Sequence, residues 1–170
     1  MENYEKETIA AIATALSDSG IGIVRISGEN AIYIVDSIFR SASGKKILTK
    51  VQSHMIHYGY IVDKDENIID EVMTSVMKAP KSYTMEDTVE INCHGGVLVM
   101  QKVLETVLQA GARLAEPGEF TKRAFLNGRI DLSRAEAVID VIHSQNEYAL
   151  SSSVSQLKGR LSDKIRSLRE

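Results

Sequence analysis

The chain has 170 residues, of which 44% are hydrophobic, 25% are charged and only 2 are proline, so it can bury a core. Its formal net charge of −3 excludes a strongly basic protein that coats nucleic acid, and its single cysteine, Cys93, excludes a disulfide framework. No stretch reaches the roughly 20 apolar residues of a membrane span, and the acidic N-terminus does not have the pattern of a signal peptide. We expect a soluble protein of the cytoplasm.

Charge and hydrophobic periodicity both change near residue 115. Residues 1–115 carry a net charge of −4 and residues 116–170 a net charge of +1. Short β-like runs separated by glycines and acidic turns precede this point, and helical spacing follows it. We therefore predict two domains, 1–117 and 118–170, with the boundary between Glu116 and Asp131.

The first domain is predicted to mix strands and helices. The expected strands are Thr8–Ala13, Gly22–Ser27, Ser53–Val62, about Ile69–Met77 and Thr88–Cys93, and the expected helices are residues 31–38 and Val97–Ala110. The polar turn Asp63–Asn67 joins two of these strands into a hairpin, and Gly111 ends the second helix. This order predicts an α+β fold built on a mixed sheet.

The second domain is predicted to be helical. A short helix, Glu119–Asn127, lies between Pro117 and Gly128, and Asp131 or Ser133 caps the next segment. From Arg134 onward, apolar residues continue at helical spacing. They form two stripes: Ala135, Val138 and Ile142, then Leu150, Val154, Leu157, Leu161, Ile165 and Leu168. An unbroken helix here is roughly 50 Å long at ~1.5 Å per residue and cannot bury its stripe alone. We expect either an oligomer or, preferably, a piece cut from a longer protein.

The first candidate site surrounds Arg25, in the run Gly20-x-Gly22-x-x-Arg25-x-Ser27-Gly28. Glycines let a backbone approach a ligand closely, and a nearby guanidinium can pair with an anionic group. The run is not the dinucleotide-binding GxGxxG motif, because its sixth position is arginine and a strand follows. Alternatively, the segment is a turn followed by an edge strand with a solvated arginine.

The second candidate site is the strand that ends in His94-Gly95-Gly96. Glu90, Asn92 and His94 share one face of this strand, while Val89, Ile91 and Cys93 share the other. A carboxylate such as that of Glu90 can accept two adjacent N–H groups from a pterin-like or guanine-like edge. The helix that follows could take an anion at its N-terminus. Alternatively, this face is simply exposed to solvent.

Other residues carry weaker signals. His54 and His57 are three apart in a strand, so they point to opposite faces and make a poor metal pair. Cys93 falls on the apolar face, which indicates a buried, inert thiol. With no tryptophan and only 5% aromatic residues, a platform for base stacking is not supported, and no GxxxxGK[ST] phosphate loop is present.

Three motifs resemble the MnmE family, also called TrmE, the tRNA-modification GTPases. They are IAAIAT with GIGIVRISG, then SYTMEDTVEINCHGG, and finally PGEFTKRAFLNGR followed by DLSRAEAVID, all in the family's order and spacing. The resemblance covers essentially the whole chain.

The resemblance implies a fold and a function. The family's N-terminal domain is similar to the folate-binding part of aminomethyltransferases, forms a homodimer and binds a one-carbon tetrahydrofolate such as 5-formyl-tetrahydrofolate. A helical domain follows, interrupted by a Ras-like G domain that hydrolyses GTP with magnesium and potassium. With the flavoprotein MnmG (GidA), the whole protein modifies carbon 5 of the wobble uridine of certain tRNAs.

The resemblance assigns the folate contacts to Arg25, Glu90 and Arg129. Two departures accompany it: the loop Ala15–Ser19 lacks the glycines and prolines of relatives, and the chain ends at Glu170. The G domain and a C-terminal Cys-x-Gly-Lys motif, whose lysine also belongs to the folate site, are therefore missing, and this chain alone is not expected to hydrolyse GTP. The alternatives are a dimerisation module that binds no ligand and, more distantly, an aminomethyltransferase acting alone.

Overall fold

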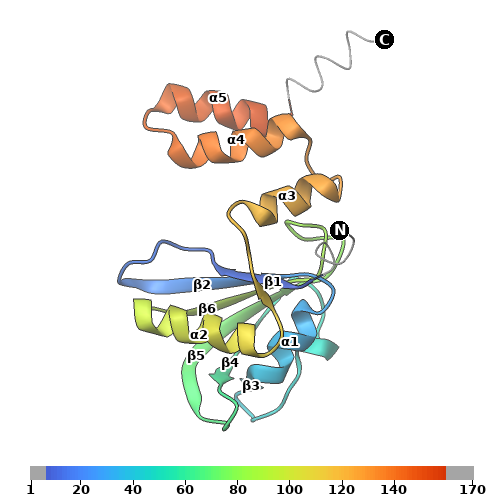
Figure 1. Ribbon diagram of the computed structural model, residues 1–170, viewed down its shortest axis with the longest axis vertical. Coiled ribbons are helices and arrows are strands. Elements are labelled where there is room, and N and C mark those ends of the chain that lie inside the picture. The colour runs from blue at the N-terminus through green and yellow to red at the C-terminus, as the bar shows by residue number, and fades with distance from the viewer. Residues whose placement is uncertain (1–6, 160–170) are drawn as a thin grey trace. The chain divides into compact units, whose positions relative to one another are not determined.

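The computed structural model describes residues 7–159, which divide between Pro117 and Gly118 into two compact units (Figure 1). The first unit is a seven-stranded sheet with helices and the second is helical, so the predicted α+β class is confirmed. The elements of the first unit are β1 (Ile9–Ile12), β2 (Ser19–Ser27), α1 (Ala31–Ile38), β3 (Phe39–Ser41), the 3₁₀ turn η2 (Leu48–Lys50), β4 (Met55–Val62), β5 (Ile68–Met77), β6 (Thr88–Gly95), α2 (Val97–Gln109) and β7 (Arg113–Leu114).

The sheet has the strand order β3-β4-β5-β6-β2-β1-β7. All neighbouring strands are antiparallel except β1 and β7, which are parallel. β2 and β6 therefore lie next to each other in the interior of the sheet, although more than sixty residues separate them in the sequence. This pairing brings the two candidate sites of the sequence together.

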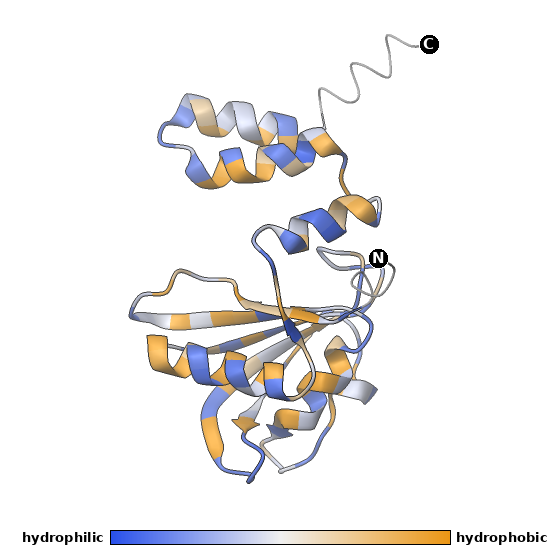
Figure 2. Cartoon of the chain, in the orientation of Figure 1, coloured by the Kyte–Doolittle hydropathy of each residue, from blue (hydrophilic) through white to orange (hydrophobic). Residues whose placement is uncertain are grey.

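One face of the sheet is covered by α1 and α2, and the core of the unit lies between them and the strands (Figures 1 and 2). Alternating strand residues supply the inward side chains, as expected for strands with one buried face. Fully buried members of this core include Val24, Ile26, Val35, Phe39, Ile61, Val76, Val89, Ile91, Met100 and Val103. The opposite face of β2, β4, β5 and β6 is free of helices within the first unit.

The central hairpin and the second helix agree with the sequence prediction. β4 and β5 are joined by a turn in which the backbone N–H of Asp63 donates to the carbonyl of Asn67. Gly111 has a φ of +117°, a conformation that favours glycine, directly after α2. The short strands β3 and β7 were not predicted, because two or three residues carry no readable periodicity.

Two glycines differ sharply in their surroundings. In β4, Gly59 pairs with Ser41 of β3, and a Cβ at this position would overlap the carbonyl of Arg40 and the ring of Phe39. At Gly20, by contrast, a Cβ would meet no heavy atom within 4 Å. Close packing of β3 against β4 therefore requires glycine at position 59.

The second unit contains α3 (Glu119–Leu126), α4 (Leu132–His143) and α5 (Glu147–Leu157). Within α3, Arg123 and Glu119 form a buried ion pair at 3.1 Å. Asp131 is the N-cap of α4, since its side chain accepts the backbone N–H of Arg134, which decides between the two predicted caps. No helix among residues 7–159 is long and apolar enough to cross a bilayer.

The helical segment that begins near Arg134 is broken into two helices, so the unbroken helix considered from the sequence does not form. The chain leaves the helical conformation at Ser144, and α5 begins after Asn146, whose side chain accepts the N–H of Ala149. Serine and asparagine compete for backbone hydrogen bonds and favour caps over helix interiors, which explains the break. α4 and α5 pack against each other instead, with Gln156 donating to the carbonyl of Ser133. The stripe residues beyond residue 159 lie outside the described part of the chain.

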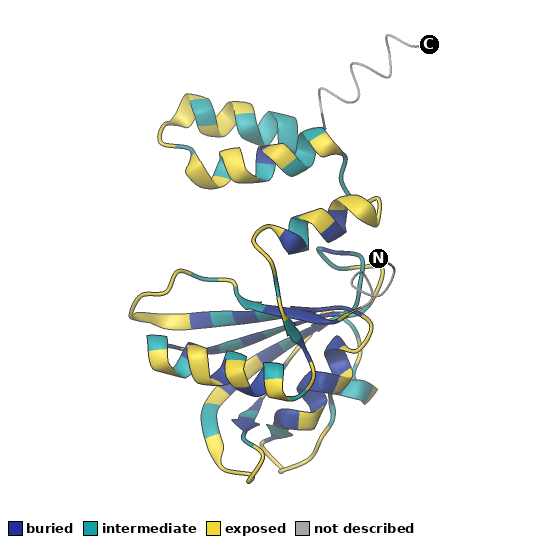
Figure 3. Ribbon diagram, viewed as in Figure 1, coloured by how far each residue is buried: buried dark blue, intermediate teal, exposed yellow. Residues whose placement is uncertain are grey.

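The two units also differ in how many of their residues are exposed to solvent (Figure 3). α5 contains no buried residue, and α4 contains only one, Ala137. Large apolar side chains such as Ile139 and Ile142 are more than 60% exposed. The helices of the second unit thus leave much of their apolar surface uncovered among the described residues.

Candidate functional site

Arg25 and Glu90 stand directly opposite each other on β2 and β6. The Nε and Nη2 of Arg25 lie 2.8 and 2.7 Å from Glu90 Oε1. Their side chains retain 29% and 22% of their accessible surface, so the pair is partly buried but reachable from solvent. The two residues selected separately from the sequence therefore form one charged pair on the sheet face that lacks helices.

Both contacts from Arg25 use the same carboxylate oxygen of Glu90. Among the described residues, Glu90 has no other hydrogen-bond donor, so Oε2 is available to a ligand N–H group. A carboxylate with one oxygen held by a guanidinium keeps its orientation and can still accept from a ligand. The pair thus offers an acceptor beside a cationic donor.

Tyr83 is the aromatic neighbour of this pair. The guanidinium carbon of Arg25 lies 5.6 Å from the centroid of the Tyr83 ring, within cation–π range. The segment that carries Tyr83 is held to β2, because the hydroxyl of Ser27 lies 2.6 Å from that of Thr84 and donates to Glu86 at 2.7 Å. Tyr83 and Glu90 together restrict the orientation of Arg25.

The alternative of an edge strand with a solvated arginine is wrong. β2 is an interior strand with β1 on one side and β6 on the other. Arg25 is engaged by Glu90, and its neighbours Val24 and Ile26 are fully buried on the helix-covered face.

The predicted polar face of β6 is confirmed. Val89, Ile91 and Cys93 are buried, whereas Glu90 and Asn92 are half-buried and His94 is exposed. The Nδ2 of Asn92 donates to the carbonyl of Met73 on β5 at 2.9 Å, which leaves its side-chain oxygen for other contacts. Burial raises the pKa of the Cys93 thiol to about 11, so this residue is an inert core thiol, as predicted.

His94 is held by Asp70 of β5. The two oxygens of Asp70 lie 2.8 Å from the backbone nitrogen and 2.7 Å from the ring Nδ1 of His94. The hydrogen bond to Asp70 raises the pKa of His94. The imidazole is 68% exposed, so the carboxylate fixes the ring while leaving its other nitrogen accessible.

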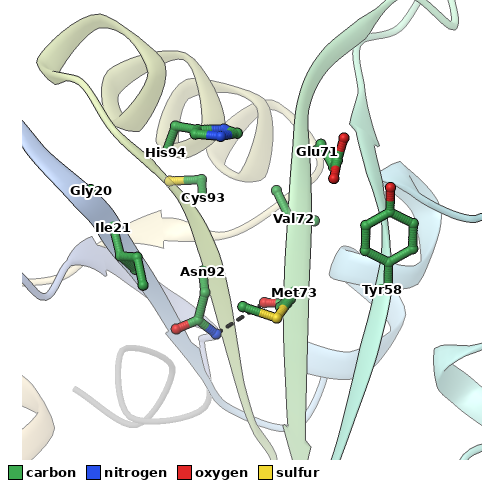
Figure 4. A pocket seen from close by; sticks show the side chains of 9 residues that line it. All are labelled: Gly20, Ile21, Tyr58, Glu71, Val72, Met73, Asn92, Cys93 and His94. Carbon is green, nitrogen blue, oxygen red and sulfur yellow. Dashed lines mark hydrogen bonds between the residues drawn. The ribbon is translucent and has the colours of Figure 1, made fainter.

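A cavity of about 210 Å³ opens beside this polar row (Figure 4). Its lining comes from β2, β4, β5 and β6 and includes Ile21, Tyr58, Glu71, Met73, Asn92 and His94. It therefore lies on the same face of the sheet as the Arg25–Glu90 pair.

Arg129 belongs to the second unit. It follows Gly128, whose φ of +78° ends α3, and its backbone N–H donates to the carbonyl of Ala124. The side chain is exposed. Its participation in the same site as Arg25 and Glu90 stays a prediction.

Residues 7–159 contain no group of three or more histidine, cysteine, aspartate or glutamate side chains that could hold a metal ion. His54 lies in the turn before β4 with a φ of +64°, and His57 lies within β4.

Comparison with known proteins connects this geometry to a family. The sequence model of the family described as "GTP-binding protein TrmE N-terminus" matches residues 8–129. The chain belongs to this TrmE N-terminal family.

Curated relatives of this TrmE N-terminal chain carry the name tRNA modification GTPase MnmE. The chain is 64% identical over 163 residues to the protein of Lachnoclostridium phytofermentans, covering 96% of this chain and 35% of the relative. It is 58% identical over 167 residues to that of Geobacillus kaustophilus, covering 98% of the chain and 36% of the relative. It is also 58% identical over 166 residues to the protein of Carboxydothermus hydrogenoformans, covering 97% of this chain and 36% of the relative. The chain thus spans about a third of the length of these relatives.

The TrmE N-terminal match includes Arg25, Glu90 and Arg129. Sequence reasoning missed Asp70 and Tyr83, which support the site without standing next to it in the sequence. Asp70 appears only as a polar residue early in a strand, and Tyr83 only as part of a turn-rich segment. Asp70 reaches His94 from the neighbouring strand, and Tyr83 reaches Arg25 from the loop before β6; no local pattern reveals such contacts.

Proposed function

We propose that this chain is the N-terminal part of a tRNA modification GTPase and binds a one-carbon tetrahydrofolate, such as 5-formyl-tetrahydrofolate, through Arg25, Glu90 and Arg129. The observation that carries the proposal is the Arg25–Glu90 pair, in which Oε2 of Glu90 is available on an accessible sheet face. Glu90 would accept N–H groups of the pterin, and the arginines would face its carbonyl or anionic groups. The bound folate would supply a one-carbon unit.

The proposal extends to the fold and the assembly. We infer a fold similar to the folate-binding part of aminomethyltransferases and a homodimer formed through the first unit. In support, the helix-free face of the sheet exposes Ile21, Ile56, Tyr58 and Met73, each by 47% or more. Contiguous exposed apolar side chains of this kind are typical of protein or ligand contacts.

The activity of the whole protein belongs to the same proposal. It comprises GTP hydrolysis with magnesium and potassium in a G domain, and modification of carbon 5 of the tRNA wobble uridine together with MnmG, in the cytoplasm. The names of the relatives support the GTPase and tRNA-modification parts. This chain contains no phosphate-loop motif and is proposed to contribute the folate and dimer contacts only.

Calorimetric titration of the chain with 5-formyl-tetrahydrofolate tests the folate site. Glu90→Gln should weaken binding roughly tenfold to a hundredfold, because loss of a charged hydrogen-bond partner costs about 1.5–3 kcal/mol. Glu66→Gln is the matched control, since Glu66 pairs with Arg40 in another part of the sheet. Equal affinity of the Glu90→Gln variant and the wild-type chain would contradict the assignment.

A dimerisation module without ligand is the rival function. The exposed apolar face of the sheet favours it as much as it favours a ligand-binding dimer. Equilibrium dialysis with labelled folate separates the two, because only the folate-binding protein retains label. Sedimentation of the same sample shows whether it is a dimer.

A further inference from the structure

A buried cluster of hydroxyl groups adjoins the Arg25–Glu90 pair. Ser27 and Thr88 stand opposite each other on β2 and β6, two residues along each strand from the ion pair. Because side chains two residues apart in a strand lie on the same face, these hydroxyl groups continue the face that carries the pair. Ser27 and Thr88 are only 0% and 1% exposed, whereas the ion pair is reachable from solvent. The accessible part of this face therefore ends beside Arg25 and Glu90.

The segment between β5 and β6, residues 78–87, connects this cluster to the ion pair. Thr84 is fully buried, and its Oγ1 lies 2.6 Å from the Oγ of Ser27. Tyr83 comes directly before Thr84, and its ring centroid lies 5.6 Å from the guanidinium carbon of Arg25. The segment is thus held at one residue and contacts Arg25 through the next.

Ser27 both accepts and donates a hydrogen bond in this cluster. Its Oγ lies 2.7 Å from Oε2 of Glu86, and an ionised carboxylate can only accept, so the single hydroxyl hydrogen of Ser27 goes to Glu86. The contact of 2.6 Å between Ser27 and Thr84 then requires Thr84 to donate. One serine therefore binds two residues of the same segment, with opposite polarity.

The contact between Tyr83 and Arg25 depends on this attachment. Loss of the Ser27 hydroxyl would remove a partner from both Thr84 and Glu86, and polar groups that lose a partner on folding are costly unless the chain moves to satisfy them. A cation–π contact extends to about 6 Å from the ring centroid, and the observed 5.6 Å is close to that limit. A small displacement of the segment therefore separates the ring from the guanidinium.

We infer that Ser27 is a positioning residue that holds Tyr83 against Arg25 and thereby fixes the orientation of the Arg25–Glu90 pair before a ligand binds. A group that is already oriented loses less freedom on binding, so the same attachment strengthens the binding of a ligand. The effect on ligand binding rests on the proposed folate function, whereas the effect on Arg25 is a property of the chain alone.

Two-dimensional ¹H–¹⁵N NMR of the chain without ligand tests the positioning. The Nε–H of Arg25, which donates to Glu90, gives the signal to follow. Tyr83→Leu removes the ring and shows how far the ring displaces this signal. Ser27→Ala and Thr84→Val should both move the signal in the direction seen with Tyr83→Leu. Thr84→Ser keeps the hydroxyl and should leave the signal at its wild-type position, whereas a serine needed for folding alone would not affect it.

Calorimetric titration of the same variants with 5-formyl-tetrahydrofolate tests the effect on binding. Ser27→Ala should weaken binding about threefold to tenfold, as expected when an oriented site becomes less ordered. Ser41→Ala is the matched control, because Ser41 is also a buried strand serine, and its hydroxyl contacts Ser43 on β3 at the edge of the sheet. This control should change neither the Arg25 signal nor the affinity.

Circular dichroism and sedimentation of each variant check its fold and oligomeric state, and the comparison of Thr84→Val with Thr84→Ser carries the test if Ser27→Ala does not fold. The inference is overturned if the Arg25 signal stays at its wild-type position in Ser27→Ala, or if Thr84→Ser moves it as far as Thr84→Val. It is also overturned if the wild-type chain binds the folate and Ser27→Ala binds it equally well. If the wild-type chain binds no folate, the proposed function fails, and the Arg25 signal still decides whether Ser27 positions the pair.

Discussion

Asp70 of β5 holds both the backbone nitrogen and the ring Nδ1 of His94, at 2.8 and 2.7 Å. A single carboxylate therefore links the beginning of β5 to the end of β6, two residues before α2 begins. Because one of the two contacts depends on the imidazole, the strength of this link depends on pH.

The contact with Asp70 should make stability higher in weak acid than in weak base. The pKa of His94 is raised in the folded chain, so the protonated ring stabilises the fold below the ordinary histidine pKa of about 6.5, and this contribution is lost as pH rises through the folded value. Urea unfolding of wild-type and His94→Gln chains should differ more at about pH 6 than at about pH 9. Asp70→Asn should remove this dependence on pH. A difference between wild type and His94→Gln that is constant, or that grows with pH, would refute the account.

Gly59→Ala should destabilise the first unit by about 1–3 kcal/mol, as is usual when an atom is forced into a closely packed site. The added methyl group would overlap the Arg40 carbonyl and the Phe39 ring, and the strand backbone can relieve this only by separating β3 from β4. Chemical denaturation measures the loss. Gly20→Ala, where nothing lies within 4 Å, should change the unfolding free energy far less. Similar values for both variants would show that β3 and β4 are not tightly packed.

Asn146→Ala distinguishes the observed helix break from a continuous helix by the sign of its effect. Because the Asn146 side chain caps α5, its loss should cost about 1 kcal/mol. In an unbroken helix the same change should stabilise, since alanine is the better helix former. Far-ultraviolet circular dichroism during urea unfolding gives the sign. Gln145→Ala serves as the control, because this exposed neighbour does not cap α5.

The sequence predicts the main elements because their residues follow clear local patterns. Val89, Ile91 and Cys93 alternate with polar residues and are buried, and Asp131 has the position and chemistry of an N-cap. The break at Ser144–Asn146 was missed because the spacing of apolar residues continues across it, although Asn146 is a residue type that favours caps.

The residues that make up the candidate site can be predicted from local sequence patterns only in part. Arg25 and Glu90 could each be selected from their neighbours, yet their pairing depends on the register of β2 against β6, which is a property of the folded sheet. Tyr83 and Asp70 contribute through contacts with residues at least twenty positions away in the sequence. Local patterns contain no information on such contacts.

The pairing of Arg25 with Glu90 has a consequence for selectivity among ligands that resemble each other. A ligand N–H group that binds Oε2 of Glu90 leaves Oε1 with Arg25, so the guanidinium stays beside the ligand as a neighbouring donor. A heterocycle with a ring carbonyl next to its N–H satisfies both residues at once. An analogue with an amino group in place of that carbonyl would set donor against donor at Arg25, so the pair should favour the carbonyl heterocycle over its amino analogue.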